Sequence, residues 1–219
     1  MNGSASNDSA NVEVRPYFAT PVAVLALPNA AALNETLAGV IRERMAAVSS
    51  TEHSNRGGWQ SEWDFAEWGG PAGAALLSAA RQLADRLTCD RAGNRVPIDW
   101  VVNAWANVNG RDHGNEFHTH PGSYWSGAYY VDDGGASDDP ALGGEFELQD
   151  PRGVAPAMYA PSLAINTPGG LSVGASELIR PKAGNMLMFP AWLSHCVRPY
   201  EGNAQRISIA FNFSLPGLG

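Results

Sequence analysis

The chain has 219 residues with 14 basic and 22 acidic side chains, which gives a net charge of −8. This length suits one domain with a sizeable core, and the negative charge argues against sequence-independent binding of nucleic acid. No apolar run reaches the roughly 18 residues that a membrane span requires.

Residues 1–14 are polar and lack the basic start and apolar segment of a signal peptide. We predict a polar tail there and a single domain over residues 15–219. The two cysteines, Cys89 and Cys196, lie far apart in the sequence, which is typical of reduced thiols. We therefore expect a cytoplasmic protein, and both a monomer and a homodimer fit these features.

The first half of the chain predicts helices that support a later β-structure. Apolar side chains recur at helical spacing over residues 33–48, which indicates an amphipathic helix. A second helix should begin at Pro71, because proline is favourable in the first helical turn. We expect this helical region, about residues 28–90, to cover one outer face of a β-core over about residues 97–215.

A Gly-rich stretch with three tryptophans, residues 54–68, lies between these helices. Exposed aromatic side chains in such a loop would indicate substrate recognition. The equal alternative is aromatic packing underneath a long loop.

The β-core should open with a strand over residues 100–108. Small apolar side chains alternate there with Asn103, Trp105 and Asn107, which therefore share one face of the strand. If this face looks into a cavity, its residues line a pocket for a cofactor or a substrate. Trp105 is our candidate contact for the substrate.

Three of the five histidines form the pattern H-x-H … H, namely His118, His120 and His195. Residues two apart in a strand point to the same face, so the first two rings can reach one centre. A third ligand from a distant strand completes a facial set and leaves positions open for substrate and oxygen. This pattern predicts a metal centre. The alternative is that the first two histidines are surface residues of a polar loop.

The last part of the chain predicts two further strands and an anion-binding pair. Residues 186–189 indicate a buried strand, and His195 stands at the start of the next one. Over residues 206–214 polar and apolar side chains alternate, so Arg206 and Ser208 share one face. A guanidinium can bind a carboxylate with two parallel hydrogen bonds, and a hydroxyl can add a third. The alternative is that this polar face is turned to water.

A long insertion rich in proline and glycine, residues 153–180, precedes these strands. Long loops at the mouth of a β-structure often act as lids.

Together these stretches resemble the Fe(II)/2-oxoglutarate-dependent oxygenase superfamily, and within it a small bacterial group of 2OG-Fe(II) oxygenases. The pattern of the superfamily is H-x-(D/E) … H … R-x-S. The matching stretches are Trp105–Asn107, His118–Ser123, Ser126–Val131, Gly143–Phe146, Asp150–Arg152, Gly184–His195 and Arg206–Ser208. The resemblance implies a mainly β fold, the double-stranded β-helix or jelly roll, with supporting helices before it.

The resemblance also implies an enzyme that uses Fe(II) and 2-oxoglutarate. His118 and His195 would be iron ligands, and Arg206 and Ser208 would bind the distal carboxylate of 2-oxoglutarate. Molecular oxygen and an unidentified small molecule or peptide would be the other reactants. The products would be succinate, CO2 and an oxidised substrate, with hydroxylation as the default outcome.

Four further residues are candidates for contacts in this site. Asn107 and Tyr129, or its neighbour Tyr130, would contact the 2-oxo acid. Arg152 and Trp192 are candidates for the substrate, although Arg152 fits a surface ion pair in a turn equally well.

One position departs from the pattern of the superfamily. The acidic ligand expected two residues after His118 is replaced by His120, which leaves one more positive charge at a three-histidine centre. Alternatively His120 lies behind a two-histidine centre. The candidates for a missing acid are Asp112, Glu116, Asp132 and Asp133, and His113 is a competing imidazole.

Two other interpretations remain open from the sequence. Cupins share the fold and often use three histidines, but their motifs have a glycine where Trp192 stands and make no use of Arg206 and Ser208. A three-histidine cupin dioxygenase that does not use 2-oxoglutarate is the enzymatic alternative. A non-catalytic jelly roll that binds a metal is the other.

Overall fold

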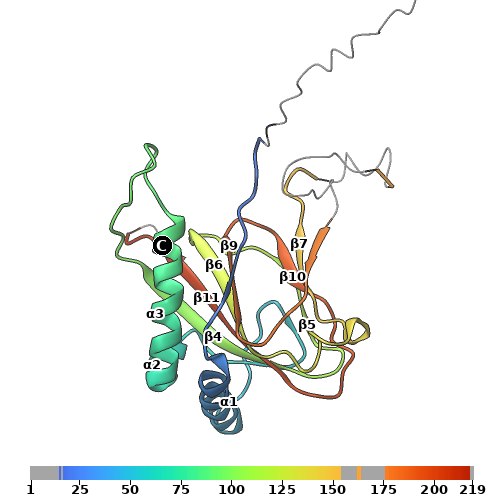
Figure 1. Ribbon diagram of the computed structural model, residues 1–219. Helices are drawn as coiled ribbons and strands as arrows, with labels where there is room; N and C mark the ends of the chain where they lie inside the picture. Colours follow the sequence, from blue (N-terminus) through green and yellow to red (C-terminus); the bar gives the residue numbers. More distant parts are fainter. Residues whose placement is uncertain (1–14, 16, 154–161, 164–175, 218–219) are drawn as a thin grey trace, which may run out of the picture.

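Two antiparallel β-sheets face each other in the computed structural model, which describes residues 15, 17–153, 162–163 and 176–217 (Figure 1). In this part of the chain the larger sheet has the strand order β1-β9-β6-β11-β4-β3 and the smaller sheet β2-β5-β10-β7-β8. The strands of the larger sheet are β1 (Ala23–Ala26), β3 (Trp59–Gln60), β4 (Val101–Asn109), β6 (Trp125–Asp132), β9 (Asn185–Pro190) and β11 (Arg206–Ser214). Those of the smaller sheet are β2 (Asn55–Arg56), β5 (Gly114–His118), β7 (Phe146–Gln149), β8 (Ser176–Ile179) and β10 (His195–Val197).

Helices cover the outer face of the larger sheet (Figure 1). The two long ones are α1 (Ala30–Ala47) and α3 (Gly70–Leu87), the short α2 (Phe65–Trp68) directly precedes α3, and a 3-10 turn spans Pro140–Leu142. Pro71 lies in the first turn of α3, as the sequence predicts. Buried side chains of α1 and α3 form one cluster with β4, β6, β9 and β11. The expected fold class, a β-structure with supporting helices, is confirmed.

Strand alternation divides the larger sheet into a helix-facing and a cavity-facing side. The helix-facing residues of its two central long strands include Ala104, Ala106, Val108, Ile207, Ile209, Phe211 and Phe213. The residues between them line the space that separates the two sheets: Trp105, Asn107, Asn109, Arg206, Ser208 and Ala210. The polar face predicted for residues 206–214 is therefore turned to the interior and not to bulk water.

Some expectations fall outside the described residues. These are the polar tail over residues 1–14 and most of the insertion over residues 153–180, with its suggested role as a lid. β8 is the described strand that falls within this insertion. None of the described helices combines the length and hydrophobicity needed to span a membrane.

Candidate metal centre and anion pocket

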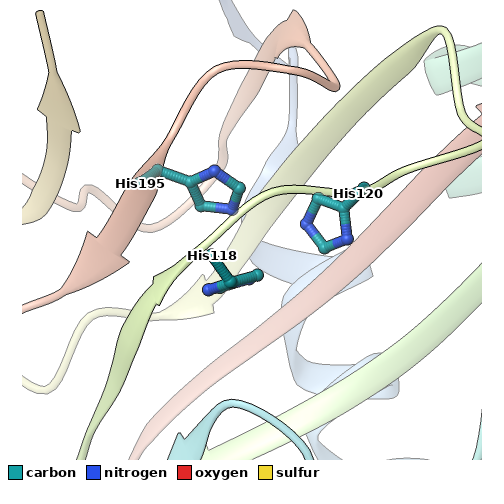
Figure 2. A group of neighbouring side chains, drawn as sticks. All are labelled: His118, His120 and His195. Atoms are coloured by element: carbon teal, nitrogen blue, oxygen red, sulfur yellow. The ribbon is translucent and has the colours of Figure 1, made fainter.

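Three histidine rings converge in the space between the sheets (Figure 2). His118 is the last residue of β5, His120 follows it in the next turn, and His195 is the first residue of β10. The pairing of β5 with β10 places His118 directly opposite His195. One ring nitrogen from each residue lies within 4.8 Å of the other two, and no other described residue belongs to such a group. This geometry can hold one metal ion.

The site keeps these imidazoles neutral. Burial, reinforced by the charge of His118, lowers the pKa of His195 to about 3. Burial and the same neighbour lower the pKa of His120 to about 4, and burial also lowers the pKa of His118. A neutral imidazole is the form that binds a metal, so the three rings are ready to coordinate at neutral pH.

Backbone carbonyls hold two of the rings in a defined tautomer. Nδ1 of His118 lies 2.7 Å from the carbonyl oxygen of Glu116, and Nδ1 of His195 lies 2.8 Å from that of Leu193. A carbonyl oxygen only accepts, so each Nδ1 carries the hydrogen and Nε2 keeps its lone pair. Metal-binding histidines are usually oriented in this way.

The carboxylates considered as substitutes for the missing acid do not join the three rings. No described carboxylate belongs to the group. Glu116 contributes its backbone carbonyl instead of its side chain, and the Asp133 carboxylate accepts hydrogen bonds from the backbone of Gly135 and Ala183. His113 accepts a hydrogen bond from the backbone of Gly110 at 2.9 Å. The three-histidine set is the arrangement that the geometry favours.

A buried arginine lies in the same pocket, without an ion-pair partner in the part of the chain that the structure describes. Arg206 is 7% exposed, and its Nε and Nη1 atoms have no hydrogen-bond partner among the described residues. Its guanidinium carbon lies 5.6 Å from the ring centroid of Tyr200. Burial is the largest influence on the pKa of Arg206 and lowers it. A buried charge with unpaired donors is unfavourable, so this arginine fits a site for an anion.

Polar groups surround Arg206 on the strands beside it. Ser208 lies opposite Asn107 on β4 and opposite Tyr130 on β6. All four side chains line an inner pocket together with the three histidines. Asn107 and Ser208 are thus located where the sequence analysis expects contacts to an oxo acid.

Tyr129 is on the wrong side of the sheet for such a contact. Its side chain lies in the helix-facing core, where its hydroxyl donates a hydrogen bond to the side chain of Asn34 on α1. The expectation for Tyr129 is wrong because adjacent residues of a strand point to opposite faces. The neighbouring Tyr130 lines the pocket instead.

Gly144 allows the backbone to approach the guanidinium of Arg206. A Cβ atom at this position would lie 2.6 Å from Nη1 of Arg206, and the residue has φ +73°. Both the close approach and the left-handed backbone therefore favour glycine. The motif Gly143–Phe146 is visible in the sequence, but its contact with Arg206 is not.

An outer hollow adjoins His118 and His120, and neither His195 nor Arg206 lines it. The two spaces have volumes of about 60 Å³ for the inner pocket and about 320 Å³ for the outer hollow. A site for one water needs about 10–15 Å³, so the inner pocket suits a small acid and the outer hollow a larger molecule. The residues that line the outer hollow are His53, Ser54, Gln60, Trp63, Asn103, Trp105, His118, Thr119, His120, Pro121, Ser123 and Asn212.

Aromatic rings form one wall of the outer hollow. The rings of His53 and Trp63 stack with centroids 5.1 Å apart, Trp63 lies 6.4 Å from Trp105, and Trp105 lies 5.7 Å from His120. Of the three tryptophans in residues 54–68, Trp63 is exposed, whereas Trp59 is buried in the core. Trp59 thus fits the packing interpretation, and Trp63 has the exposure that the recognition interpretation requires.

The two remaining substrate candidates lie outside both spaces. Trp192, which is 58% exposed, lines neither the inner pocket nor the outer hollow. Arg152 forms an ion pair with Asp150, with Nη2 and Oδ2 2.6 Å apart, in the turn after β7. The structure thus favours the surface ion pair for Arg152.

A family model described as "Putative 2OG-Fe(II) oxygenase" matches residues 103–212. The match covers half of the chain and includes the three histidines, Arg206 and Ser208. The chain therefore belongs to this family of 2OG-Fe(II) oxygenases, which are enzymes that use Fe(II) and 2-oxoglutarate. Family membership favours this interpretation over the cupin and the non-catalytic jelly roll. No curated protein matches the chain.

Solved structures of similar fold agree with the architecture. A prolyl-4-hydroxylase of Pseudomonas putida has a TM-score of 0.64 and 19% identity over 90% of this chain and 94% of its own. A prolyl hydroxylase of Trichoplax adhaerens has a TM-score of 0.63 and 16% identity over 90% and 84% of the two chains. HygX of Streptomyces hygroscopicus, solved with nickel and 2-oxoglutarate, has a TM-score of 0.58 and 12% identity over 90% and 84%. At such identities the likeness concerns the fold alone.

Proposed function

We propose that His118, His120 and His195 bind Fe(II) and that Arg206 binds the distal carboxylate of 2-oxoglutarate. The observation that carries this proposal is the buried guanidinium of Arg206 in the pocket of the three histidines, with Nε and Nη1 unpaired among the described residues. When bound, iron and 2-oxoglutarate supply the oxidising chemistry of the family, in which O2 is consumed, succinate and CO2 are released and a substrate is oxidised. Hydroxylation is the outcome we propose.

The protein's own residues orient and shield these reactants. The three imidazoles are neutral ligands, and carbonyl oxygens fix two of them with Nε2 free. Ser208 and Tyr130 offer hydroxyl groups next to Arg206 for the same carboxylate. Phe146 and Phe189 lie against the ring of His195, with centroids 5.1 and 4.7 Å away. Such apolar contacts exclude water from one side of the centre.

The substrate, we propose, binds in the outer hollow. No lining residue of this hollow in the described chain is Asp, Glu, Lys or Arg, so it suits an uncharged part of a molecule. The face of Trp63 and the side-chain amides of Asn103 and Gln60 offer stacking and hydrogen bonds. The Trichoplax adhaerens relative is in complex with a peptide fragment, and HygX has been solved with hygromycin B. A peptide segment and a polar small molecule are the two classes to test.

Two titrations test the co-substrate and the substrate separately. Binding of 2-oxoglutarate to the Mn(II)-loaded protein should be tight in the wild type and weak in Arg206→Ala. Absence of 2-oxoglutarate binding in the wild type would refute the proposal. Oxygen consumption with panels of short peptides and polar small molecules should then identify compounds whose KM rises in Trp63→Ala. Trp192→Ala is the matched control, because the two indoles are 53% and 58% exposed but only Trp63 lines the hollow.

We also propose the cytoplasm as the compartment of this enzyme. Both Cys89 and Cys196 are free thiols, which agrees with a reducing environment. Cell fractionation with an antibody against the chain tests this.

A further inference from the structure

The ring of His120 has a different partner from the other two rings of the centre. Its Nδ1 lies 3.2 Å from Nδ2 of the Asn212 side chain, whereas the other two Nδ1 atoms face backbone carbonyl oxygens. Asn212 lies on β11, is 9% exposed and lines the outer hollow. The third ring is therefore held by an amide group that can either donate or accept.

The orientation of this amide decides whether His120 can bind a metal. If Nδ2 of Asn212 donates to Nδ1 of His120, the single hydrogen of the neutral ring is on Nε2, and Nε2 has no lone pair for a metal. If the amide is turned by 180°, Oδ1 accepts the hydrogen of Nδ1 and Nε2 is free to coordinate. The oxygen and nitrogen of an amide occupy nearly the same space, so both orientations fit.

No other contact selects between these two orientations. Oδ1 of Asn212 is buried and has no hydrogen-bond partner in the part of the chain that the structure describes. The tautomer of His120 and the orientation of the amide are thus linked to each other alone. A ligand that occupies Nε2 of His120 will turn the amide, and a side chain that only accepts will prepare Nε2 for the ligand.

We propose that Asn212 is the positioning residue that makes His120 the third metal ligand, through Oδ1 accepting the hydrogen of Nδ1. This inference rests on the proposed function, because it takes the three histidines as the metal centre. It explains how a neutral residue at this place can coordinate as the other two do. It also assigns the choice between a two-histidine and a three-histidine centre to a residue on another strand.

The experiment combines Zn(II) titration with long-range 1H–15N NMR of the histidine rings, Zn(II) being a diamagnetic substitute for Fe(II). In the Zn(II)-loaded wild type, we expect the hydrogen of His120 on Nδ1. Asn212→Leu removes the amide and should weaken Zn(II) binding by about 10–100-fold, the usual effect of losing such a partner. Asn212→Asp only accepts, so it should keep wild-type affinity or exceed it, with the hydrogen on Nδ1 even before Zn(II) is added.

Asn103→Leu is the matched control, because Asn103 lies directly opposite Asn212 on β4 and also lines the outer hollow. Its Zn(II) affinity should equal that of the wild type. The inference is overturned if His120 carries its hydrogen on Nε2 in the loaded protein, or if Asn212→Leu binds Zn(II) as tightly as the wild type. Equal weakening by the Leu and Asp variants would show a packing role and overturn it as well.

Two further variants separate this inference from the proposed function. His118→Ala and His195→Ala should each abolish Zn(II) binding. If they do and Asn212→Leu has no effect, only the role of Asn212 is refuted. If they leave Zn(II) binding unchanged, the metal centre itself is refuted.

Discussion

Arg206→Met should have opposite effects on ligand binding and on the stability of the ligand-free protein. Methionine keeps much of the length of the side chain but removes the charge. Removing one partner of a buried charge pair costs about 2–5 kcal/mol, and each 1.4 kcal/mol or so is a factor of about ten in affinity. The Kd for 2-oxoglutarate should therefore rise by about thirtyfold or more. Arg206→Lys should recover part of this loss, because lysine lacks the planar fork.

The ligand-free protein should respond in the other direction. Arg206 is buried with two nitrogen atoms unpaired among the described residues, and an uncompensated buried charge is unfavourable. Without 2-oxoglutarate, Arg206→Met should melt at or above the temperature of the wild type. With saturating 2-oxoglutarate, the wild type should gain stability and the variant should not.

Calorimetric titration of 2-oxoglutarate into the Mn(II)-loaded protein and thermal melts with and without 2-oxoglutarate measure both effects. The control is Arg42→Met, which changes an exposed arginine on α1 and should alter neither. A ligand-free Arg206→Met that loses several kcal/mol, together with unchanged 2-oxoglutarate binding, would mean that Arg206 serves the fold and not an anion.

Three further predictions concern the approach of Gly144 to Arg206, the metal centre and the ion pair of Glu147 with Arg198. Gly144→Ala should weaken 2-oxoglutarate binding, because the new Cβ would lie 2.6 Å from Nη1 of Arg206 and displace the buried guanidinium. Gly93→Ala is the control, because Gly93 has a similar φ of +86° but nothing within 4 Å of the new Cβ. Titration of 2-oxoglutarate into both variants separates crowding from backbone strain. His195→Ala should remove metal from the protein in elemental analysis, whereas His53→Ala, which lies outside the group of three, should retain it. A hydrogen bond from Arg198 lowers the pKa of Glu147. The charged carboxylate of Glu147 therefore stabilises the fold above the unfolded pKa, and this contribution is lost as the pH falls through the lowered, folded pKa. Glu147→Gln should therefore cost about 1 kcal/mol at pH 7, and urea unfolding should show this difference shrink as the pH falls through the lowered pKa of Glu147. A loss that stays equal down the acid series would contradict the charge argument.

Alternation made the long strands and their polar faces predictable. On β11 the polar side chains at positions 206, 208 and 212 stand between large apolar ones, and the structure turns this polar set to the cavity. The same alternation places Asn212 on the face of Arg206, so its position beside the cavity was predictable. Its contact with His120 was not, because it depends on how the chain turns after β5. Contacts between strands far apart in sequence cannot be read from spacing.

The wrong expectation for Tyr129 has a physical reason. β6 is buried on both faces, with helices on one side and the cavity on the other. Its sequence therefore lacks the polar and apolar alternation that would identify the inner face. Two adjacent tyrosines fit either face, and only the pairing of Ser208 with Tyr130 decides between them.

Turns limited the prediction of substrate contacts. Arg152 is held by the carboxylate two residues before it, an interaction that competes with any role in a pocket. Trp192 follows the end of β9, where the direction of the chain depends on the turn. Trp63 lines the outer hollow and stacks on His53. This is a contact between two loop segments, which no periodic pattern in the sequence encodes.

The local charge of the site is opposite to that of the whole protein. The chain has a net charge of −8, yet among the described residues that line the inner pocket Arg206 is the charged side chain, and no carboxylate accompanies it. A divalent metal on three neutral imidazoles adds two further positive charges, where the usual acidic ligand would cancel one. A dianion such as 2-oxoglutarate is the complement of this pocket, and neutral or cationic molecules are not. With His120 as the third ligand, the centre would therefore strengthen the selection for an anionic co-substrate. A substrate in the uncharged outer hollow would be selected by stacking and hydrogen bonding.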